Sequence, residues 1–313
     1  MPYTPQEAAA KARFVQFAYS MFGDGSNLNP APDPGLASLG YTVLANMTAQ
    51  DLHTTKFYGY IAAAASTPGD LVIAIRGTQT PAEWLLDFSA LPLPFMDLGL
   101  VAAGFRSIAQ SILITVAPGS SMSLTDAIVN LNAQHAITSV TVLGHSLGGA
   151  LATLVAAELA SANPANVKSM LSVWTYASPR VGLPDFMSKF NSQIPTTYRI
   201  WNVLDIVPEV PTFPYVHVGG NGEKLTQSEQ QLQELVTIPS CEHHLTTYQW
   251  LLESSLFKLD CDCDHECEVP APAAGAMALD HADARAKARR AQARRVSAAE
   301  RARGAHALFV ALQ

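Results

Sequence analysis

Residues 141–150 constrain the fold more than any other part of the chain. They carry a Gly-x-Ser-x-Gly motif, Gly144 to Gly148, with an apolar β-branched run before it and an apolar helix-forming run after it. The two glycines let the backbone turn sharply and let strand and helix approach closely. A strand-turn-helix unit of this kind holds the hydroxyl of Ser146 out of the sheet as a candidate nucleophile. The alternative is an ordinary glycine turn between a strand and a helix.

Strands and helices are expected to alternate along most of the chain. Apolar periodicity and capping residues predict helices over 4–22, 104–134 with a break near 118–120, 150–160, 184–190 and 243–257. Apolar runs rich in β-branched residues predict strands over 41–47, 57–65, 70–77, 137–143, 167–177, 197–203 and 215–219. Loops are expected over 23–40 and 90–96, and a polar surface helix or loop over 224–236. The pattern favours an α/β protein with a mostly parallel central sheet and helices on both faces.

Three polar residues directly follow predicted strands, where functional residues of such sheets lie: Thr78, Ser146 and Asp205. A turn at Thr78 can aim a hydroxyl and N–H groups at a developing negative charge, although a simple polar turn is the alternative. A serine nucleophile needs a base, usually histidine, which a carboxylate orients. Asp205 is the best candidate acid, because Asp185 falls on a predicted surface helix; the alternative is a solvated loop aspartate.

The candidate bases are histidines that follow Asp205, because hydrolases with this turn have the chain order Ser, Asp or Glu, His. His243 and His244 open the last predicted helix of the core, where a loop can bring one of them back to the serine. His217 lies between two valines and is predicted to be structural or to line a pocket. His145 adjoins the serine but is expected to point away from it and to pack.

Taken together, these residues give the chain a resemblance to class 3, or fungal-type, lipases. The matching segments cover about residues 10–256 and follow the family's order. They are 75–78, Trp84, Asp87, 104–105, 142–152, 175–182, 205–208 and 243–248. The resemblance implies an α/β-hydrolase fold and a carboxylic-ester hydrolase. The chain departs from the family pattern at Ala102, where many relatives have histidine, and in a C-terminal tail that the pattern does not cover.

The resemblance also implies roles for individual residues. Ser146 would be the nucleophile and Asp205 the acid, and Thr78 and the backbone N–H of Leu147 would form the oxyanion hole. The segment around Trp84 would be the lid. The family's base precedes a Leu or Met and a Tyr. This fits His243 at one spacing and His244 at a shorter one, and we prefer His243.

The predicted function is a serine carboxylic-ester hydrolase that acts on triacylglycerol or related lipid esters through an acyl-enzyme, and neither a metal nor an organic cofactor is required. A phospholipase A1 or a short-chain carboxylesterase would use the same residues. A catalytically silent α/β-hydrolase that serves as a binding module is the alternative from another class. The expected partners are a lipid or ester substrate and, transiently, a lipid interface.

Charge is distributed unevenly along the chain. Residues 281–313 hold eight Lys and Arg against two Asp and Glu, whereas the other 280 residues hold eleven against 24. The acidic main body is not expected to bind nucleic acid. No apolar run reaches the ~18 residues that span a bilayer. Residues 1–7 lack the basic start and apolar core of a secretory signal, so a cytoplasmic location is the default expectation.

Composition predicts three regions: a lipase-like α/β-hydrolase domain over 1–258, a Cys/Asp- and Pro/Ala-rich linker over 259–280, and a basic Ala/Arg-rich tail over 281–313. The tail is predicted to be a solvated helix or disordered, and contact with anionic lipid or with the acidic body is the alternative.

Four cysteines lie near the boundary of the first two regions: Cys241, Cys261, Cys263 and Cys267. Metal binding, a disulfide and unpaired thiols are all open for this group. The last three have the spacing C-x-C-x3-C, which is not the paired C-x2-C typical of zinc sites.

Overall fold

The computed structural model describes residues 3–51, 54–78, 89–117, 119–220, 222–225, 241–257 and 259. The chain divides into two units, 1–266 and 267–313, and every described residue belongs to the first. Except for Leu259, the predicted linker over 259–280 and the predicted tail over 281–313 lie outside the described residues.

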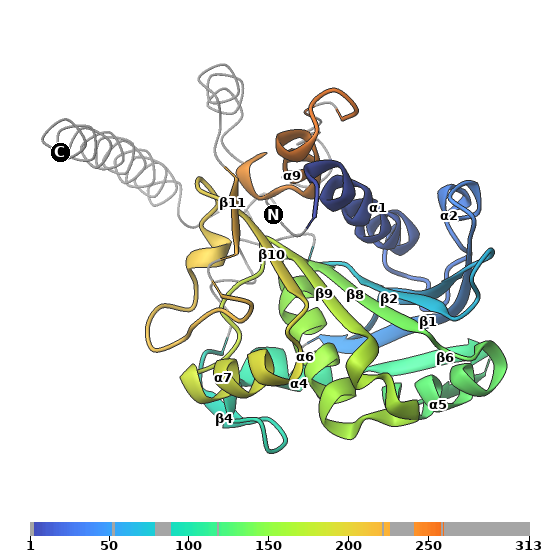
Figure 1. Ribbon diagram of the computed structural model, residues 1–313, viewed down its shortest axis with the longest axis horizontal. Coiled ribbons are helices and arrows are strands. Elements are labelled where there is room, and N and C mark those ends of the chain that lie inside the picture. Colours follow the sequence, from blue (N-terminus) through green and yellow to red (C-terminus); the bar gives the residue numbers. More distant parts are fainter. Residues whose placement is uncertain are drawn as a thin grey trace, which may run out of the picture. The chain divides into compact units, whose positions relative to one another are not determined.

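A mixed sheet forms the centre of the described part of the chain, and its nine strands have the order β11-β10-β9-β8-β3-β2-β1-β6-β7 (Figure 1). The strands are β1 (Tyr41–Asp51), β2 (Thr54–Ala64), β3 (Asp70–Ile75), β6 (Leu113–Ala117), β7 (Ser120–Met122), β8 (Ser139–His145), β9 (Leu171–Tyr176), β10 (Thr197–Asn202) and β11 (Glu223–Leu225). Neighbours from β3 through β8, β9 and β10 to β11 are parallel. Those from β3 through β2, β1 and β6 to β7 are antiparallel.

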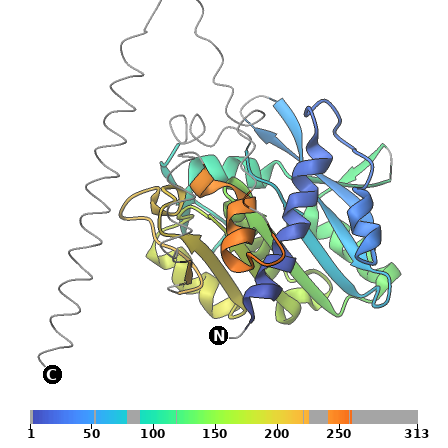
Figure 2. The ribbon, with the colours of Figure 1, turned by 90° about the horizontal axis from the view of Figure 1, so that it is seen from above.

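Helices cover both faces of this sheet, as the alternating pattern predicts (Figures 1 and 2). One face carries α4 (Ala103–Gln110), α5 (Leu124–His135), α6 (Leu147–Ala162) and α7 (Pro184–Gln193), and the other carries α1 (Pro5–Phe22), the short α2 (Pro34–Ser38) and α9 (Leu245–Leu252). The central strand β3 alternates between the two cores. Its Ile73 and Ile75 pack with the α6 side, and Val72 and Ala74 with the α1 side. This period of two follows from the strand geometry and accounts for the unbroken apolar run.

Two helices matter most for the site. Helix α6 is apolar almost all round and is buried along most of its length, because it lies directly against the sheet. Helix α1 begins as predicted, with the side chain of Thr4 accepting a hydrogen bond from the Glu7 backbone and with Pro5 in the first turn. Helices α1 and α9 lie side by side, although they come from opposite ends of the described chain (Figure 2).

Residues 104–134 are mainly helical as expected, but the break between the two helices is longer than the one expected near 118–120. Helix α4 ends at Gln110, and the antiparallel pair β6–β7 occupies residues 113–122. The run Leu113 to Val116 is rich in β-branched residues, and β6 pairs with β1 and buries Ile114. Pairing with this available strand favours the extended conformation over a helix.

Smaller differences concern the loops. The strand expected over 215–219 is reduced to a single bridge between Val216 and Gly182, and β11 forms where a polar helix or loop was expected. The apolar loop over 90–96 contains β4 (Pro92–Pro94), which pairs with β5 (Leu100–Ala102). The last helix begins only at Leu245, after a 3-10 turn, η3 (Cys241–His243). None of the helices described is both long and apolar enough to cross a membrane.

Candidate active site

Ser146 stands alone between β8, which ends at His145, and α6, which begins at Leu147. Its backbone has φ 56° and ψ −127°, a conformation that residues other than glycine rarely adopt. The turn is tight enough to require glycine before the serine, because a Cβ on Gly144 would lie 2.0 Å from the carbonyl oxygen of Gly148. The backbone N–H of Ser146 donates to the carbonyl of Tyr176 on the neighbouring strand over 2.9 Å. The predicted strand-turn-helix unit is therefore present.

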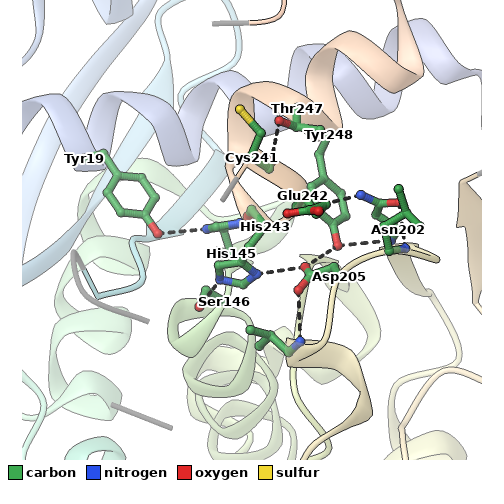
Figure 3. A network of polar contacts seen from close by, with 12 residues as sticks. Tyr19, His145, Ser146, Asn202, Asp205, Cys241, Glu242, His243, Thr247 and Tyr248 are labelled. Carbon is green, nitrogen blue, oxygen red and sulfur yellow. Dashed lines mark hydrogen bonds and ion pairs between the residues drawn. The ribbon is translucent and has the colours of Figure 1, made fainter. Parts of the chain in front are cut away.

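The structure brings Ser146, His243 and Asp205 into one hydrogen-bonded line (Figure 3). Nε2 of His243 lies 2.8 Å from Oγ of Ser146, and Nδ1 of the same ring lies 2.8 Å from Oδ2 of Asp205. Because the carboxylate can only accept, Nδ1 carries the proton, and Nε2 of the neutral ring is left to accept from the serine hydroxyl. The imidazole in this line belongs to His243, and His244 is the next residue, at the start of α9.

Asp205 is fully buried and well supplied with donors. Its Oδ1 accepts from the backbone N–H of Val207 over 2.9 Å, and its Oδ2 also accepts from the hydroxyl of Tyr248 over 2.7 Å. Burial first, and then the charge of Asp205, raise the pKa of Tyr248 well above its usual value, so its hydroxyl stays protonated and donates. The Tyr248 oxygen in turn accepts from the backbone N–H of Asn202 over 3.0 Å. These donors hold the carboxylate in place.

The turn that carries His243 is fixed from both sides. The side-chain amide of Asn202 donates to the carbonyl of Glu242 over 2.9 Å, and the hydroxyl of Thr247 donates to the carbonyl of Cys241 over 2.7 Å. Cys241 is disulfide-bonded, so of metal binding, a disulfide and an unpaired thiol, the disulfide applies to this cysteine. Cys261, Cys263 and Cys267 lie outside the described residues.

Thr78 directly follows Gly77, which touches the serine turn. A Cβ on Gly77 would lie 2.9 Å from Cβ of Ser146. The hydroxyl oxygen of Thr78 is buried and has no hydrogen-bond partner within the described part of the chain. The backbone N–H of Leu147 stands at the first position of α6, where helix N–H groups lack intrahelical acceptors and the helix dipole favours negative charge.

His145 is buried and His217 is partly buried, and the two rings differ in their contacts. His145 does point away from the serine: its Nδ1 bonds the hydroxyl of Tyr19 and its Nε2 the carbonyl of His243, each over 2.8 Å. Burial first, and then His243, lower the pKa of His145 well below its usual value. His217 donates from Nε2 to the carbonyl of Pro208 over 2.8 Å, and burial lowers its pKa to about 3.

Several large apolar side chains among the described residues are exposed. Ile206 adjoins Asp205 and is 43% exposed, and Phe213 and Leu91 are 88% and 62% exposed. The hydroxyl of Tyr215 donates to the carbonyl of Ala90, so the segments that carry Leu91 and Phe213 approach one another. Trp84, the predicted lid residue, lies outside the described residues.

Sequence reasoning missed the polar support of this site. Tyr248, Tyr19 and Asn202 have no predicted role in the site. The motif that runs from His243 to Tyr248 was a usable signal for Tyr248, because it places a tyrosine one turn into the helix that follows the base. No local pattern marks Tyr19 or Asn202, whose partners are distant in sequence.

The sheet, the strained serine turn and the chain order Ser, Asp, His are those of the α/β-hydrolase fold. Residues 72–215 match the family model described as Lipase (class 3), which confirms the resemblance. Phospholipase A1-II 4 of Oryza sativa subsp. japonica is 35% identical over an alignment of 193 residues that covers 53% of this chain and 47% of that protein. The chain thus spans about half the length of this curated relative.

Solved lipase structures share the fold. A triacylglycerol lipase described as having a serine protease triad at its catalytic centre superimposes with a TM-score of 0.57 at 23% identity, over 72% of this chain and 81% of that one. A lipase from Rhizopus microsporus var. chinensis gives a TM-score of 0.54 at 23% identity, over 68% and 70% of the two chains. These likenesses confirm the predicted α/β-hydrolase fold.

Proposed function

We propose that this protein is a serine carboxylic-ester hydrolase that acts on lipid esters, with Ser146 as nucleophile, His243 as base and Asp205 as acid. The observation that carries the proposal is the position of the His243 ring, 2.8 Å from the Ser146 hydroxyl on one side and 2.8 Å from the Asp205 carboxylate on the other. The match to class 3 lipases supports the same reaction class. We prefer His243 to His244 because its ring spans both partners.

In the first half of the reaction, Oγ of Ser146 bonds to the ester carbonyl carbon while its proton passes to Nε2 of His243. The carbonyl π electrons move onto oxygen, and the Thr78 hydroxyl and the Leu147 N–H stabilise this oxyanion. When the oxyanion collapses, the bond to the alcohol oxygen breaks, and His243 gives its proton to that oxygen. Asp205 stays ionised and stabilises the imidazolium.

In the second half, water replaces the serine as nucleophile. His243 takes a proton from the water as the oxygen attacks the acyl-enzyme, and it returns this proton to Oγ of Ser146 when the acid leaves. The residues thus regenerate themselves without a cofactor. The buried hydroxyl of Thr78 has no hydrogen-bond partner among the described residues, which supports the oxyanion role, because a substrate oxygen would give it an acceptor.

Lipid esters fit the surroundings of the site. The exposed side chains of Leu91, Ile206 and Phe213 would favour contact with a lipid surface, which supports the proposed transient lipid contact. The lid role of the segment around Trp84 is proposed from the family resemblance. Triacylglycerol is the first candidate substrate, and phospholipids are the second because of the relative named phospholipase A1. A short-chain esterase would not need these exposed apolar residues.

A fluorophosphonate probe tests the reaction class. The protein should be labelled at Ser146, and Ser146→Ala should abolish both labelling and ester hydrolysis while the protein stays folded. A panel of p-nitrophenyl esters, emulsified triacylglycerol and phospholipid vesicles then identifies the substrate. A folded protein that is neither labelled nor active on the panel would favour the silent binding module.

The remaining expectations are also proposals. We propose a lipase-like domain over 1–258 followed by a linker and a basic tail, and no nucleic-acid partner for the acidic body. A cytoplasmic location agrees less well with the disulfide at Cys241, because cytosolic reductants keep most thiols reduced. Thiol counting on protein from fractionated cells would test the location: a reduced Cys241 in a cytosolic fraction supports it, and an oxidised one in a secreted fraction contradicts it.

A further inference from the structure

One tyrosine links two parts of the site that come from different elements. The hydroxyl of Tyr19, on α1, accepts a hydrogen bond from the backbone N–H of Gly77 and contacts Nδ1 of His145, each over 2.8 Å. On the other side of the same ring, Nε2 of His145 lies 2.8 Å from the carbonyl oxygen of His243 (Figure 3). Gly77 precedes the proposed oxyanion donor, and His243 is the proposed base.

The direction of every proton in this chain of hydrogen bonds is determined. A carbonyl can only accept, so Nε2 of His145 carries the hydrogen and its Nδ1, in the neutral ring, accepts. The Tyr19 hydroxyl therefore donates to Nδ1 and uses a lone pair for the N–H of Gly77. The chain runs from Gly77 through Tyr19 and His145 to His243 with each group in a single role, and such a chain is rigid and mutually reinforcing.

Ring packing adds a second set of contacts. The ring of His145 lies 4.9 Å from the ring of His243, centroid to centroid, with 36° between their planes. Tyr19 and Tyr248 meet the same His145 ring edge to face, at 5.8 and 6.1 Å. The His145 side chain thus contacts both the backbone carbonyl and the ring of His243. It is not itself part of the hydrogen-bonded line Ser146–His243–Asp205.

We propose that Tyr19 and His145 form a positioning pair that aligns the catalytic base with the oxyanion turn. The proposal rests on the proposed function, because it concerns the same reaction. Neither residue touches the reacting atoms, so the pair acts through the main chain of His243 and of Gly77. Small displacements of a catalytic group are costly, since a shift of about 1 Å can lower a rate about 10²-fold.

Tyr19→Phe tests the pair, because it keeps the ring and removes only the hydroxyl. With a soluble p-nitrophenyl ester we expect kcat to fall at least about tenfold and KM to stay within about twofold, because alignment rather than binding is lost. Tyr60→Phe is the matched control. The Tyr60 hydroxyl donates to the carbonyl of Phe14 over 2.8 Å and so also ties α1 to the sheet, but within the described part of the chain it makes no hydrogen bond to a residue of the site. Tyr60→Phe should lower the melting temperature and leave kcat unchanged.

Two substitutions of His145 test its hydrogen bond to His243 and its hydrogen bond to Tyr19 one at a time. The amide nitrogen of Gln can replace Nε2 and keep the bond to the His243 carbonyl, whereas the shorter Asn can replace only Nδ1. We expect His145→Gln to retain more of kcat than His145→Asn. Adding Tyr19→Phe to His145→Gln should cost less than Tyr19→Phe does alone, because residues that act as a unit are not additive.

The outcomes distinguish the pair from the reaction itself. If the unaltered protein is neither labelled by fluorophosphonate nor active, the proposed function fails. If it is active and Tyr19→Phe changes kcat by less than twofold, the positioning pair is refuted. It is also refuted if Tyr19→Phe and Tyr60→Phe lower kcat equally, since the hydroxyl would then only hold α1 to the sheet.

Discussion

A partly buried neutral histidine makes the stability of this protein depend on pH, and His217 offers a measurable case. Its Nε2–H donates to the carbonyl of Pro208 over 2.8 Å. Burial first, and then the positive charge of Arg199, lower the pKa of His217 from 6.5 to about 3. At pH 5 the side chain therefore stays neutral in the folded protein, whereas it is mostly protonated in the unfolded chain.

The magnitude follows from this difference. The pKa of the folded state lies below that of the unfolded state, so the unfolded chain binds an extra proton as the pH falls below about 6.5, and the folded state loses stability. The effect is close to zero at pH 8. At pH 5 it reaches about 2 kcal/mol, because each pH unit below the unfolded pKa is worth about 1.4 kcal/mol. It stops growing only near the folded pKa.

His217→Gln removes the titrating group and keeps an N–H donor for the Pro208 carbonyl. We would measure the free energy of unfolding by urea titration at pH 5, 6, 7 and 8 for both proteins. The difference should move in favour of the variant by about 2 kcal/mol between pH 8 and pH 5, since all other titrating groups are shared and cancel.

Tyr60→Phe serves as the control for this experiment, because burial raises the pKa of Tyr60 and keeps it from titrating in this range. Its effect on the free energy of unfolding should not depend on pH. If the difference for His217→Gln is equally independent of pH, the reasoning that burial holds His217 neutral is wrong.

Three further predictions concern the site. Thr78→Ala should lower kcat about 10²-fold and Thr78→Ser should retain most of it, if the hydroxyl is an oxyanion donor; equal rates for the two in steady-state assays would contradict that role. Tyr248→Phe should lower the free energy of unfolding by about 2–4 kcal/mol, because a buried carboxylate loses a donor and the Asn202 N–H an acceptor; an unchanged thermal melt would contradict these bonds. Phe213→Ser should slow hydrolysis of emulsified lipid severalfold and leave stability and soluble-ester hydrolysis unchanged; equal losses on both substrates would argue against a lipid-contact role.

The sequence is most informative where a functional residue is adjacent to the element that positions it. Ser146 and Asp205 each come within a few residues of a buried strand, and strand ends are readable from local apolar patterns. The choice between His243 and His244 is different in kind. It depends on the turn η3, whose orientation comes from bonds to Asn202 and Thr247 that no local pattern reveals.

Pairing between distant strands also escapes local patterns. Residues 113–117 can form a helix or a strand by composition, and only the free edge of β1 decides for the strand. The mixed character of the sheet has the same origin, since its antiparallel half depends on how β1, β2 and β6 meet. Tyr19 illustrates the limit best, because its partner His145 is 126 residues away.

The contact between α1 and α9 has a consequence for how the protein folds. Tyr19 comes from the first helix and His243 from the turn before the last one, so the site is complete only after both ends of the described chain have docked on the sheet. Contacts this distant in sequence form slowly, because the conformational entropy of closing a long loop is lost before the contacts can stabilise the structure. During refolding, the return of ester hydrolysis should therefore lag behind the return of sheet structure measured by circular dichroism. During that interval the protein has regained its sheet but does not yet have an assembled active site.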